Sequence, residues 1–196
     1  MGASERNEDR RRIWHRIVTN LDARRLVFLD ESGANITLAR RYGRAPKGER
    51  SPGSAPRNYG RNLTLVAALS LHGLDAPMLL DGAMDSSAFE QYVTTFLVPR
   101  LRPGQLVILD NLSVHRQAPI RQAITTAGCR VLFLPSYSPD FNPIELAFSK
   151  IKAYIRRVGA RTQEALEAAI ATAIDLVTPS DAHGYFRHCG YVNSVQ

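Results

Sequence analysis

The sequence predicts an α/β fold in which a mixed five-stranded sheet is flanked by helices. Three apolar segments early in the chain have the character of strands, and helical and strand patterns alternate after them. The segments at 26–30 and 105–110 are almost continuously aliphatic up to a terminal aspartate, as in central parallel strands buried on both faces. We therefore expect three antiparallel strands first and further strands joined through helices afterwards.

The first 25 residues are rich in arginine, and their apolar side chains recur at helical spacing. Trp14, Ile17, Val18 and Leu21 fall on one side of such a helix. We expect this helix to pack its apolar side on the rest of the protein. On this reading, residues 1–25 are a basic helical extension of a domain that covers residues 26–192.

A long basic segment follows the first expected strand. Residues 40–61 contain many glycines and prolines and seven basic residues against one acid. This composition predicts a loop inserted into the domain, and a loop of this length is usually either functional or disordered. The segments 62–71 and 74–80 then predict a β-hairpin, with His72 and Gly73 at its turn.

Helices and strands alternate in the second half of the chain. The expected elements are, in order, a helix at 86–101, a strand at 105–110, a helix at about 116–127, a strand at 130–135, a helix within the segment 138–157, and helices at about 162–176 and about 179–188. In the segment 138–157 the helix begins with Asn142 as its N-cap and Pro143 at its first position, because proline suits the start of a helix.

The charge balance indicates a polyanionic partner. The net charge is +7 and the pI is about 9.8, values that are common among nucleic-acid-binding proteins and also found in basic soluble enzymes. Cys129 and Cys189 do not make a disulfide framework and fit a reducing compartment. No long apolar run and no apolar signal core are present. We expect a cytoplasmic protein that has no membrane partner.

Three acidic residues stand where a ligand site is expected. Asp30 and Asp110 end two apolar strands, and ligands of α/β sheets bind outside the carboxyl ends of strands. If those strands are parallel neighbours, the two carboxylates converge and repel each other, and a divalent cation such as Mg²⁺ would remove the repulsion. Glu145, in the first turn of the helix after the last strand, is the third candidate.

Each acid also has a simpler structural interpretation. Asp30 and Asp110 are residue types found at turns, and Asn142 with Glu145 fits a helix capping box. Asp30 and Glu31 after an apolar strand also fit an ATPase motif. That reading fails because its phosphate loop is missing: the nearest glycine pair is followed by Glu49 instead of lysine.

The three acids together, placed after the first, fourth and fifth strands, match the order of the ribonuclease H-like fold. The segments "LVFLDESG", "LVILDNLSVH" and "LPSYSPDFNPIELAFSKIK" resemble the D-D-E catalytic domain of mariner-like bacterial insertion-sequence transposases. The second and third acids, at positions 110 and 145, leave 34 residues between them, which is similar to this family. The resemblance covers roughly residues 12–192.

The resemblance implies metal-dependent DNA strand cleavage and strand transfer at transposon ends. Asp30, Asp110 and Glu145 would hold two Mg²⁺ ions, for which Mn²⁺ would substitute. Water would nick the element end, and the liberated 3′-hydroxyl would attack the target DNA. Asn142 would cap its helix and hold Glu145 in place. The other supporting candidates are His115 and the neighbours of the two aspartates, Glu31 and Asn111. The simpler interpretation of His115 is that it only begins a helix.

The resemblance also implies partners. They are double-stranded DNA at the transposon ends and the target, a second copy of the chain, and a helix-turn-helix region that precedes this chain or belongs to a separate protein. The site of action would be the bacterial nucleoid. The residues expected to contact DNA are Arg40, Arg41, Arg44, Lys47, Arg57, Arg61, Lys152 and Arg156. The alternative interpretation is that they belong to a solvated loop and a solvated helix face without a DNA contact.

Two other functions remain open on the sequence. A structure-selective nuclease or resolvase of the same fold would use the same three acids for hydrolysis alone. A non-catalytic remnant of a transposase would bind DNA or a partner without cutting. The intact set of acids favours the catalytic interpretation.

Overall fold

A computed structural model describes residues 7–18, 20–39, 43–52, 58 and 60–192. Its centre is a five-stranded sheet in the order β3-β2-β1-β4-β5. β1 pairs antiparallel with β2 and parallel with β4, β2 pairs antiparallel with β3, and β4 pairs parallel with β5. The strands are β1 Leu26–Ala34, β2 Leu63–Ser70, β3 Gly73–Asp81, β4 Leu106–Leu109 and β5 Arg130–Phe133. The predicted mixed five-stranded sheet is confirmed.

The central strand β1 is longer than predicted. Its parallel pairing with β4 stops at Leu29 opposite Leu109, whereas its antiparallel pairing with β2 continues to Ala34 opposite Leu63. The hydrogen bonds of β2 therefore carry β1 four residues beyond the expected end at Asp30. Asp30 consequently lies inside the strand, at the point where its neighbour β4 ends.

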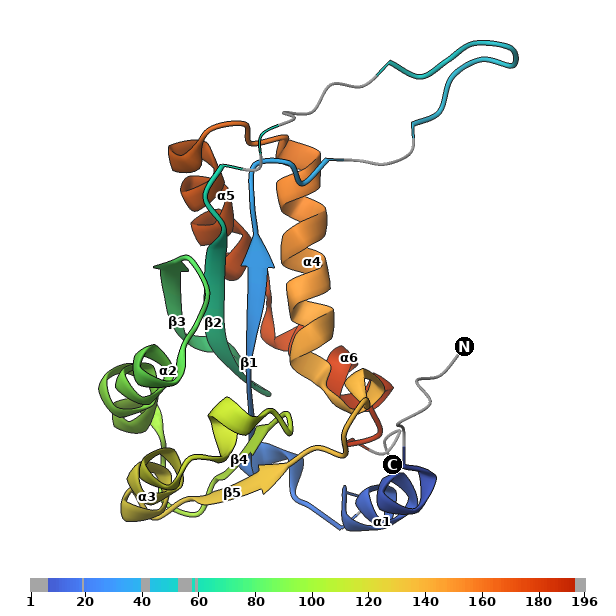
Figure 1. Ribbon diagram of the computed structural model, residues 1–196. Helices are drawn as coiled ribbons and strands as arrows, with labels where there is room; N and C mark the ends of the chain where they lie inside the picture. Colours follow the sequence, from blue (N-terminus) through green and yellow to red (C-terminus); the bar gives the residue numbers. More distant parts are fainter. Residues whose placement is uncertain (1–6, 19, 40–42, 53–57, 59, 193–196) are drawn as a thin grey trace.

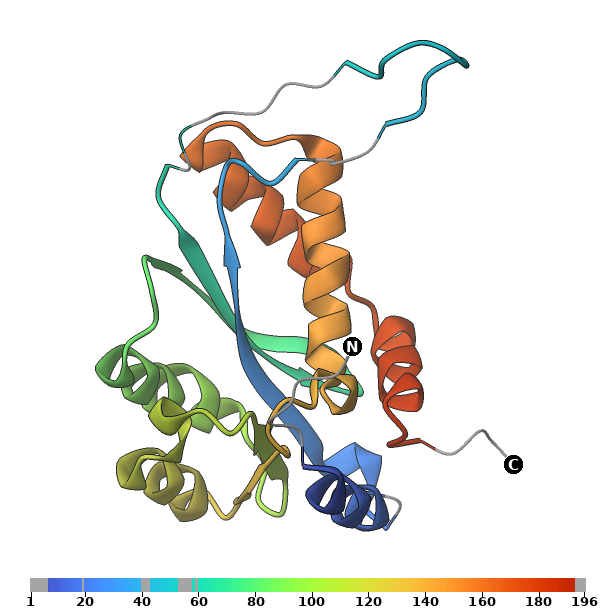
Figure 2. The same ribbon diagram turned by 45° about the vertical axis from the view of Figure 1, so that its right-hand side comes forward.

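Helices cover both faces of the sheet (Figures 1 and 2). One face carries α1 Glu8–Val18, α4 Pro143–Val158, α5 Gln163–Asp175 and α6 Pro179–His188. The other carries α2 Ser86–Tyr92, the π-helical turn η2 Val93–Leu97 and α3 Ala118–Thr126. The remaining short helices are η1 Ala23–Arg25, η3 Val98–Arg100, η4 Ser113–Arg116 and η5 Pro139–Phe141.

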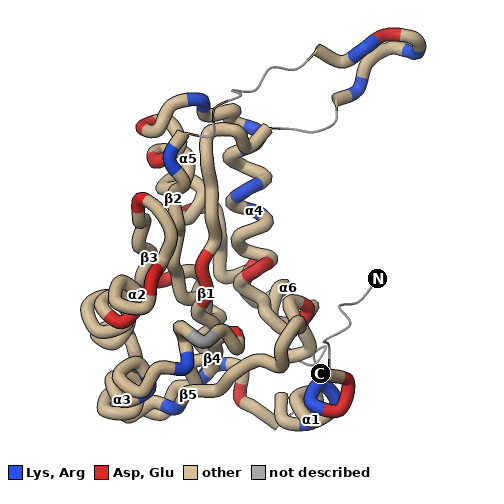
Figure 3. Tube along the Cα trace, viewed as in Figure 1, with Lys and Arg blue, Asp and Glu red and all other residues tan. Residues whose placement is uncertain are grey.

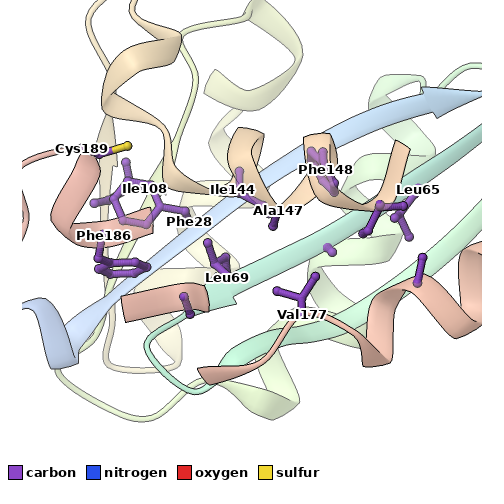
Figure 4. Packing of buried hydrophobic residues seen from close by; sticks show 14 of the residues in the cluster. Phe28, Leu65, Leu69, Ile108, Ile144, Ala147, Phe148, Val177, Phe186 and Cys189 are labelled. Atoms are coloured by element: carbon purple, nitrogen blue, oxygen red, sulfur yellow. The ribbon is translucent and has the colours of Figure 1, made fainter. Parts of the chain in front are cut away.

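The alternation of side chains along β1 divides the interior into two cores. Phe28 packs on the α4 face, and Leu29 packs on the α2 face. In the first core the Phe28 ring meets Phe186 edge-on, with 5.3 Å between centroids, close to Ile144 and Leu69 (Figure 4). Burial on both faces explains why the strand reads as an unbroken apolar run.

The N-terminal helix α1 belongs to the same core. Trp14 and Val18 are buried in it, which confirms the predicted packing, but Ile17 and its neighbour Ile13 point outward. The Trp14 indole donates a hydrogen bond to the Tyr191 hydroxyl (3.1 Å), which donates to the Phe141 carbonyl (2.6 Å). The segment before α4 is therefore tied to α1 and to the end of the chain.

The helix expected at 86–101 is divided into α2, η2 and η3. The amide of Val98 reaches the carbonyl of Val93, which widens the turn, and Pro99 has no amide hydrogen to extend an α-helix. The N-cap of α2 is Asp85, whose side chain accepts a hydrogen bond from the Ala88 amide (2.8 Å). None of the described helices is long and apolar enough to span a membrane.

Candidate active site

The pleat of the sheet brings the three acids to one side. Asp30 has the same parity in β1 as Phe28, and Asp110, directly after β4, has the parity of Ile108. Both positions therefore belong to the face covered by α4, whose first turn contains Glu145. Asp30, Asp110 and Glu145 line one cavity of about 370 Å³.

Asp30 is the buried member of this group, with 8% of its surface exposed. Its carboxylate accepts hydrogen bonds from the backbone amide of Glu31 (2.8 Å) and from the side-chain amide of Asn142 (2.8 Å). Burial, together with the negative charges of Glu145, Glu31 and Asp110, raises the pKa of Asp30 to about 7. A cation in the cavity would relieve this concentration of negative charge.

Asp110 is held by a buried histidine. The His115 Nδ1 lies 2.5 Å from Asp110 Oδ1, and its Nε2 lies 3.0 Å from Glu31 Oε1. The ring packs on Phe89, with 4.3 Å between centroids. Burial by itself lowers the pKa of His115, but the hydrogen bonds to Asp110 and Glu31 raise it to about 9. His115 therefore joins two carboxylates from neighbouring strands.

The simpler interpretation of His115, as a residue that only begins a helix, is therefore incomplete. Glu31 has the opposite parity to Asp30 and points to the α2 face, where His115 and Phe89 lie. The Glu31 carboxylate is consequently linked to Asp110 through the His115 ring, whereas the Glu31 backbone amide binds the Asp30 carboxylate.

The predicted side-chain cap by Asn142 is wrong. Asn142 occupies the N-cap position, and its carbonyl accepts the Glu145 amide (3.2 Å), but its side chain makes no capping bond. The side chain turns instead to the buried carboxylate of Asp30, which is the stronger acceptor. The Asn142 side-chain oxygen, also buried, has no hydrogen-bond partner among the described residues. Asn142 thus supports Asp30, and no side-chain bond links it to Glu145.

The donor set of the cavity fits a hard divalent cation. Carboxylates from β1, the end of β4 and α4 border it, together with Asn142, whose Oδ1 is buried and unpartnered. Oxygen donors of this kind are the ligands of Mg²⁺ and Mn²⁺. As the side chains stand, no three His, Cys, Asp or Glu residues within the described ranges are grouped closely enough to hold a metal ion.

The mouth of the cavity is formed by two loops. Asn111, after β4, donates a hydrogen bond to the Ser136 hydroxyl after β5 (3.2 Å), so this supporting candidate ties the loops together. Leu112, Tyr137 and Ser138 also line the cavity. These three residues were not among the predicted site residues. All three belong to the segments that carry the family resemblance, which was the available signal.

The expected DNA contacts divide into two groups. Lys152 and Arg156 follow Glu145 along α4 by seven and eleven residues and are partly exposed. Arg44 and Lys47 lie in the described loop 43–52, which projects beyond the C-terminal end of α4, far from the acids (Figures 1 and 3). Arg61 pairs with Asp81 (2.7 Å). The candidates Arg40, Arg41 and Arg57 lie outside the described residues.

Comparisons with known proteins identify the family and the fold. Residues 25–167 match the family described as DDE superfamily endonuclease. None of the curated proteins matches the chain. The fold is similar to a Mos1 transposase paired-end complex with left transposon end (TM-score 0.79, 16% identity, 97% of this chain and 62% of that chain). It is also similar to the Mos1 mariner paired end complex with Mn (0.77, 18%, 97% and 62%).

The catalytic domain of Mos1 mariner transposase is a third similar structure, with a TM-score of 0.70, 16% identity and coverage of 97% of this chain and 91% of that one. The chain thus spans 62% of the first two Mos1 chains and nearly all of the isolated domain. These likenesses confirm the ribonuclease H-like fold. Because the family match covers 25–167 of 196 residues, the chain belongs to the DDE superfamily endonuclease family.

Proposed function

We propose that this chain is the catalytic domain of a DNA transposase, which cuts DNA strands at transposon ends and joins them to target DNA. One observation carries the proposal: Asp30, Asp110 and Glu145, from three separate elements, border a single cavity. Membership of the DDE endonuclease family supports DNA cleavage. The similarity to mariner transposase structures supports cleavage of this particular kind.

Asp30, Asp110 and Glu145 would hold two Mg²⁺ ions, or Mn²⁺ in their place, with the Asn142 side-chain oxygen as a further donor. Ions bound there would supply charge stabilisation for the phosphodiester and a more acidic water molecule. The titles of similar Mos1 structures name Mg and Mn, which supports a divalent ion for the family. The buried carboxylate of Asp30, close to the negative charges of Glu145, Glu31 and Asp110, supplies an independent physical reason for a cation here.

The side chains of this chain have defined tasks in the reaction. Asn142 orients the carboxylate of Asp30, and His115, backed by Glu31, orients that of Asp110. In the first step, water attacks the phosphorus and the 3′-oxygen of the neighbouring nucleotide leaves with a proton. In the second step, that 3′-hydroxyl attacks a phosphorus of the target strand and gives up its proton, and the target 3′-oxygen leaves with a proton.

The DNA backbone is proposed to pass along α4. Lys152 and Arg156 extend from the acidic end of this helix, and the net charge of +7 favours a polyanion. The loop bearing Arg44 and Lys47 lies too far from the cavity to contact the same phosphates, so we assign it to distant DNA or to a second copy of the chain. A helix-turn-helix region, before this chain or on another protein, would read the transposon ends.

The first test is a plasmid-nicking assay with the purified chain and Mg²⁺ or Mn²⁺. We expect nicking that Asp110→Asn abolishes and that Asp175→Asn, which changes an exposed acid of α5, leaves unchanged. Undiminished nicking by Asp110→Asn, or equal loss in both variants, would overturn the proposed assignment.

The second test distinguishes the alternatives. Oligonucleotides carrying a transposon-end 3′-hydroxyl are incubated with plasmid, and covalent joining is measured. Joining supports a transposase. Nicking without joining indicates the nuclease or resolvase. Binding without either reaction indicates the non-catalytic remnant.

Affinity for DNA should also fall steeply with salt concentration, and Lys152→Ala should reduce the slope of log K against log salt by about 1.

A further inference from the structure

Two large apolar side chains stand exposed at the mouth of the acidic cavity. Leu112 has 54% of its surface exposed and Tyr137 has 57%, and both line the cavity that contains the three acids. We call this pair the apolar rim. Other large exposed apolar side chains, such as Ile13 and Phe96, do not line this cavity. The apolar rim thus combines hydrophobic exposure with direct access to the reacting centre.

Tyr137 is held in an unfavourable backbone conformation. Its φ of +55° lies in the left-handed region, which an aromatic residue rarely adopts. Ala76 is the other non-glycine residue of the described chain with a positive φ. A glycine or asparagine would adopt this conformation more readily. The ring is therefore presented at a backbone position that favours smaller residues.

The surrounding loop is fixed by its own hydrogen bonds. Ser136 accepts the bond from Asn111 (3.2 Å) and, through its carbonyl, one from the buried Ser138 hydroxyl (3.3 Å). The Leu134 amide bonds to the Leu109 carbonyl (2.8 Å), which aligns the two loops at the ends of β4 and β5. The Tyr137 hydroxyl makes no hydrogen bond within the described ranges, which leaves the ring available to a ligand.

We infer that the apolar rim is a stacking subsite for an unpaired nucleobase next to the phosphodiester on which the acids act. This inference rests on the proposed function, because it takes the cavity to receive a DNA strand. Leucine offers no donor to a phosphate and tyrosine offers only its hydroxyl, whereas the flat face of a base stacks on the tyrosine ring and packs against the leucine side chain. Proteins that bind unpaired DNA commonly stack its bases on aromatic side chains.

The experiment measures binding without cleavage, in EDTA, with two DNA probes. Both are the same duplex with a short single-stranded 3′ overhang, which in one probe carries thymines and in the other is abasic. Since the phosphates are equal in number, the electrostatic contribution cancels. We expect the wild-type chain to bind the thymine overhang about tenfold more tightly than the abasic one.

Four variants identify the cause of that preference. Tyr137→Asn removes the ring and keeps a residue suited to the left-handed backbone, and it should abolish most of the preference. Leu112→Ala should reduce it, and Tyr137→Phe should retain it. Phe96→Ala is the matched control, because this ring is 42% exposed but lies on η2 outside the cavity. It should leave the preference unchanged.

Three results would overturn the inference: equal binding of both probes by wild type, loss of preference in Phe96→Ala as large as in Tyr137→Asn, or a change of oligomeric state in Tyr137→Asn without a change of preference. The last would assign the apolar rim to a contact between copies. The outcome is separable from the proposed function. A base preference with no nicking activity refutes the catalysis alone, and nicking with no base preference refutes the subsite alone.

Discussion

The side-chain amide of Asn142 donates a 2.8 Å hydrogen bond to the carboxylate of Asp30, joining the start of α4 to the middle of β1. Both residues are buried, and their bond spans 112 positions of sequence. The helix that carries Glu145 is thereby fixed to the strand that carries the first acid. The relative position of two acids thus depends on a residue that is itself uncharged.

Loss of this bond should impair cleavage more than folding. We expect Asn142→Ala to lower the nicking rate about 10- to 100-fold, because residues that orient metal-binding carboxylates have effects of this size. Nicking kinetics and urea unfolding should be measured together. The control is Asn62→Ala, whose exposed side chain accepts a bond from Asn35 far from the cavity. A variant that nicks at the wild-type rate would show that Asp30 needs no support from Asn142.

The bridge through His115 should be visible as an energetic coupling. Glu31→Gln and His115→Gln each replace one ionisable member of a partly buried hydrogen-bonded pair (3.0 Å) by a neutral amide. In a double-mutant cycle followed by urea unfolding, we expect a coupling free energy of about 0.5–3 kcal/mol. His115→Gln should also lower the nicking rate, since Asp110 loses its partner. Additive effects of the two substitutions on stability would contradict the bridge.

The hydroxyl of Tyr191 should contribute measurably to stability. Tyr191→Phe leaves the Phe141 carbonyl without its donor and the Trp14 indole without its acceptor, both in the buried interior. We expect a loss of about 1–3 kcal/mol in the free energy of unfolding, measured with urea. Tyr154→Phe, in which the ring contact with Arg157 is kept, is the control and should change stability little. Equal effects of the two variants would mean that the buried hydroxyl contributes nothing specific.

The dependence of the free energy of unfolding on pH should involve Asp181 at acidic pH. Hydrogen bonds from Lys150 and Thr178 lower the pKa of Asp181 from 3.8 to about 2. A carboxyl with a lowered pKa stabilises the fold above its unfolded pKa, and this stabilisation is lost as the pH falls from about 4 to about 2. Asp181→Asn, which also weakens the capping box of α6, should therefore cost about 1 kcal/mol at neutral pH.

Urea unfolding at several pH values measures the difference in the free energy of unfolding between wild type and Asp181→Asn. This difference should become smaller as the pH falls through the range of about 4 to 2, because protonated aspartic acid resembles asparagine. Asp175→Asn, at an exposed position of α5, serves as the control. A difference between wild type and Asp181→Asn that stays constant down to about pH 2 would contradict the assigned ion pair.

The strands and their succession along the chain were predictable because this information is local. Each core strand is an apolar run, and the acids follow from their position after those runs. The length of β1 was not predictable in the same way. Its last four residues pair only with β2, and "ESGA" carries no strand pattern of its own. The strand continues there because the tertiary hydrogen bonds of β2 outweigh local preference.

The supporting residues of the site depended on partners distant in sequence. Asn142 with Glu145 fits a local capping box, but Asp30, 112 positions away, takes the amide instead. His115 and Glu31, separated by 84 positions, meet only because β1 and β4 are adjacent. The residues of the cavity mouth, Leu112 and Tyr137, follow from loop geometry that composition does not encode. Long-range pairing therefore decided what the local sequence left open.

The pairing of β1 with β4 has a consequence for the order in which the protein is made and folds. Leu26 pairs with Leu106, 80 positions later in the chain, so this contact closes a long loop and forms slowly. During synthesis, Asp30 emerges long before Asp110, and Glu145 emerges last. An incomplete nascent chain therefore lacks part of the acidic set. On the proposed function, a nascent chain would therefore acquire the complete acidic set only after Glu145 has been made.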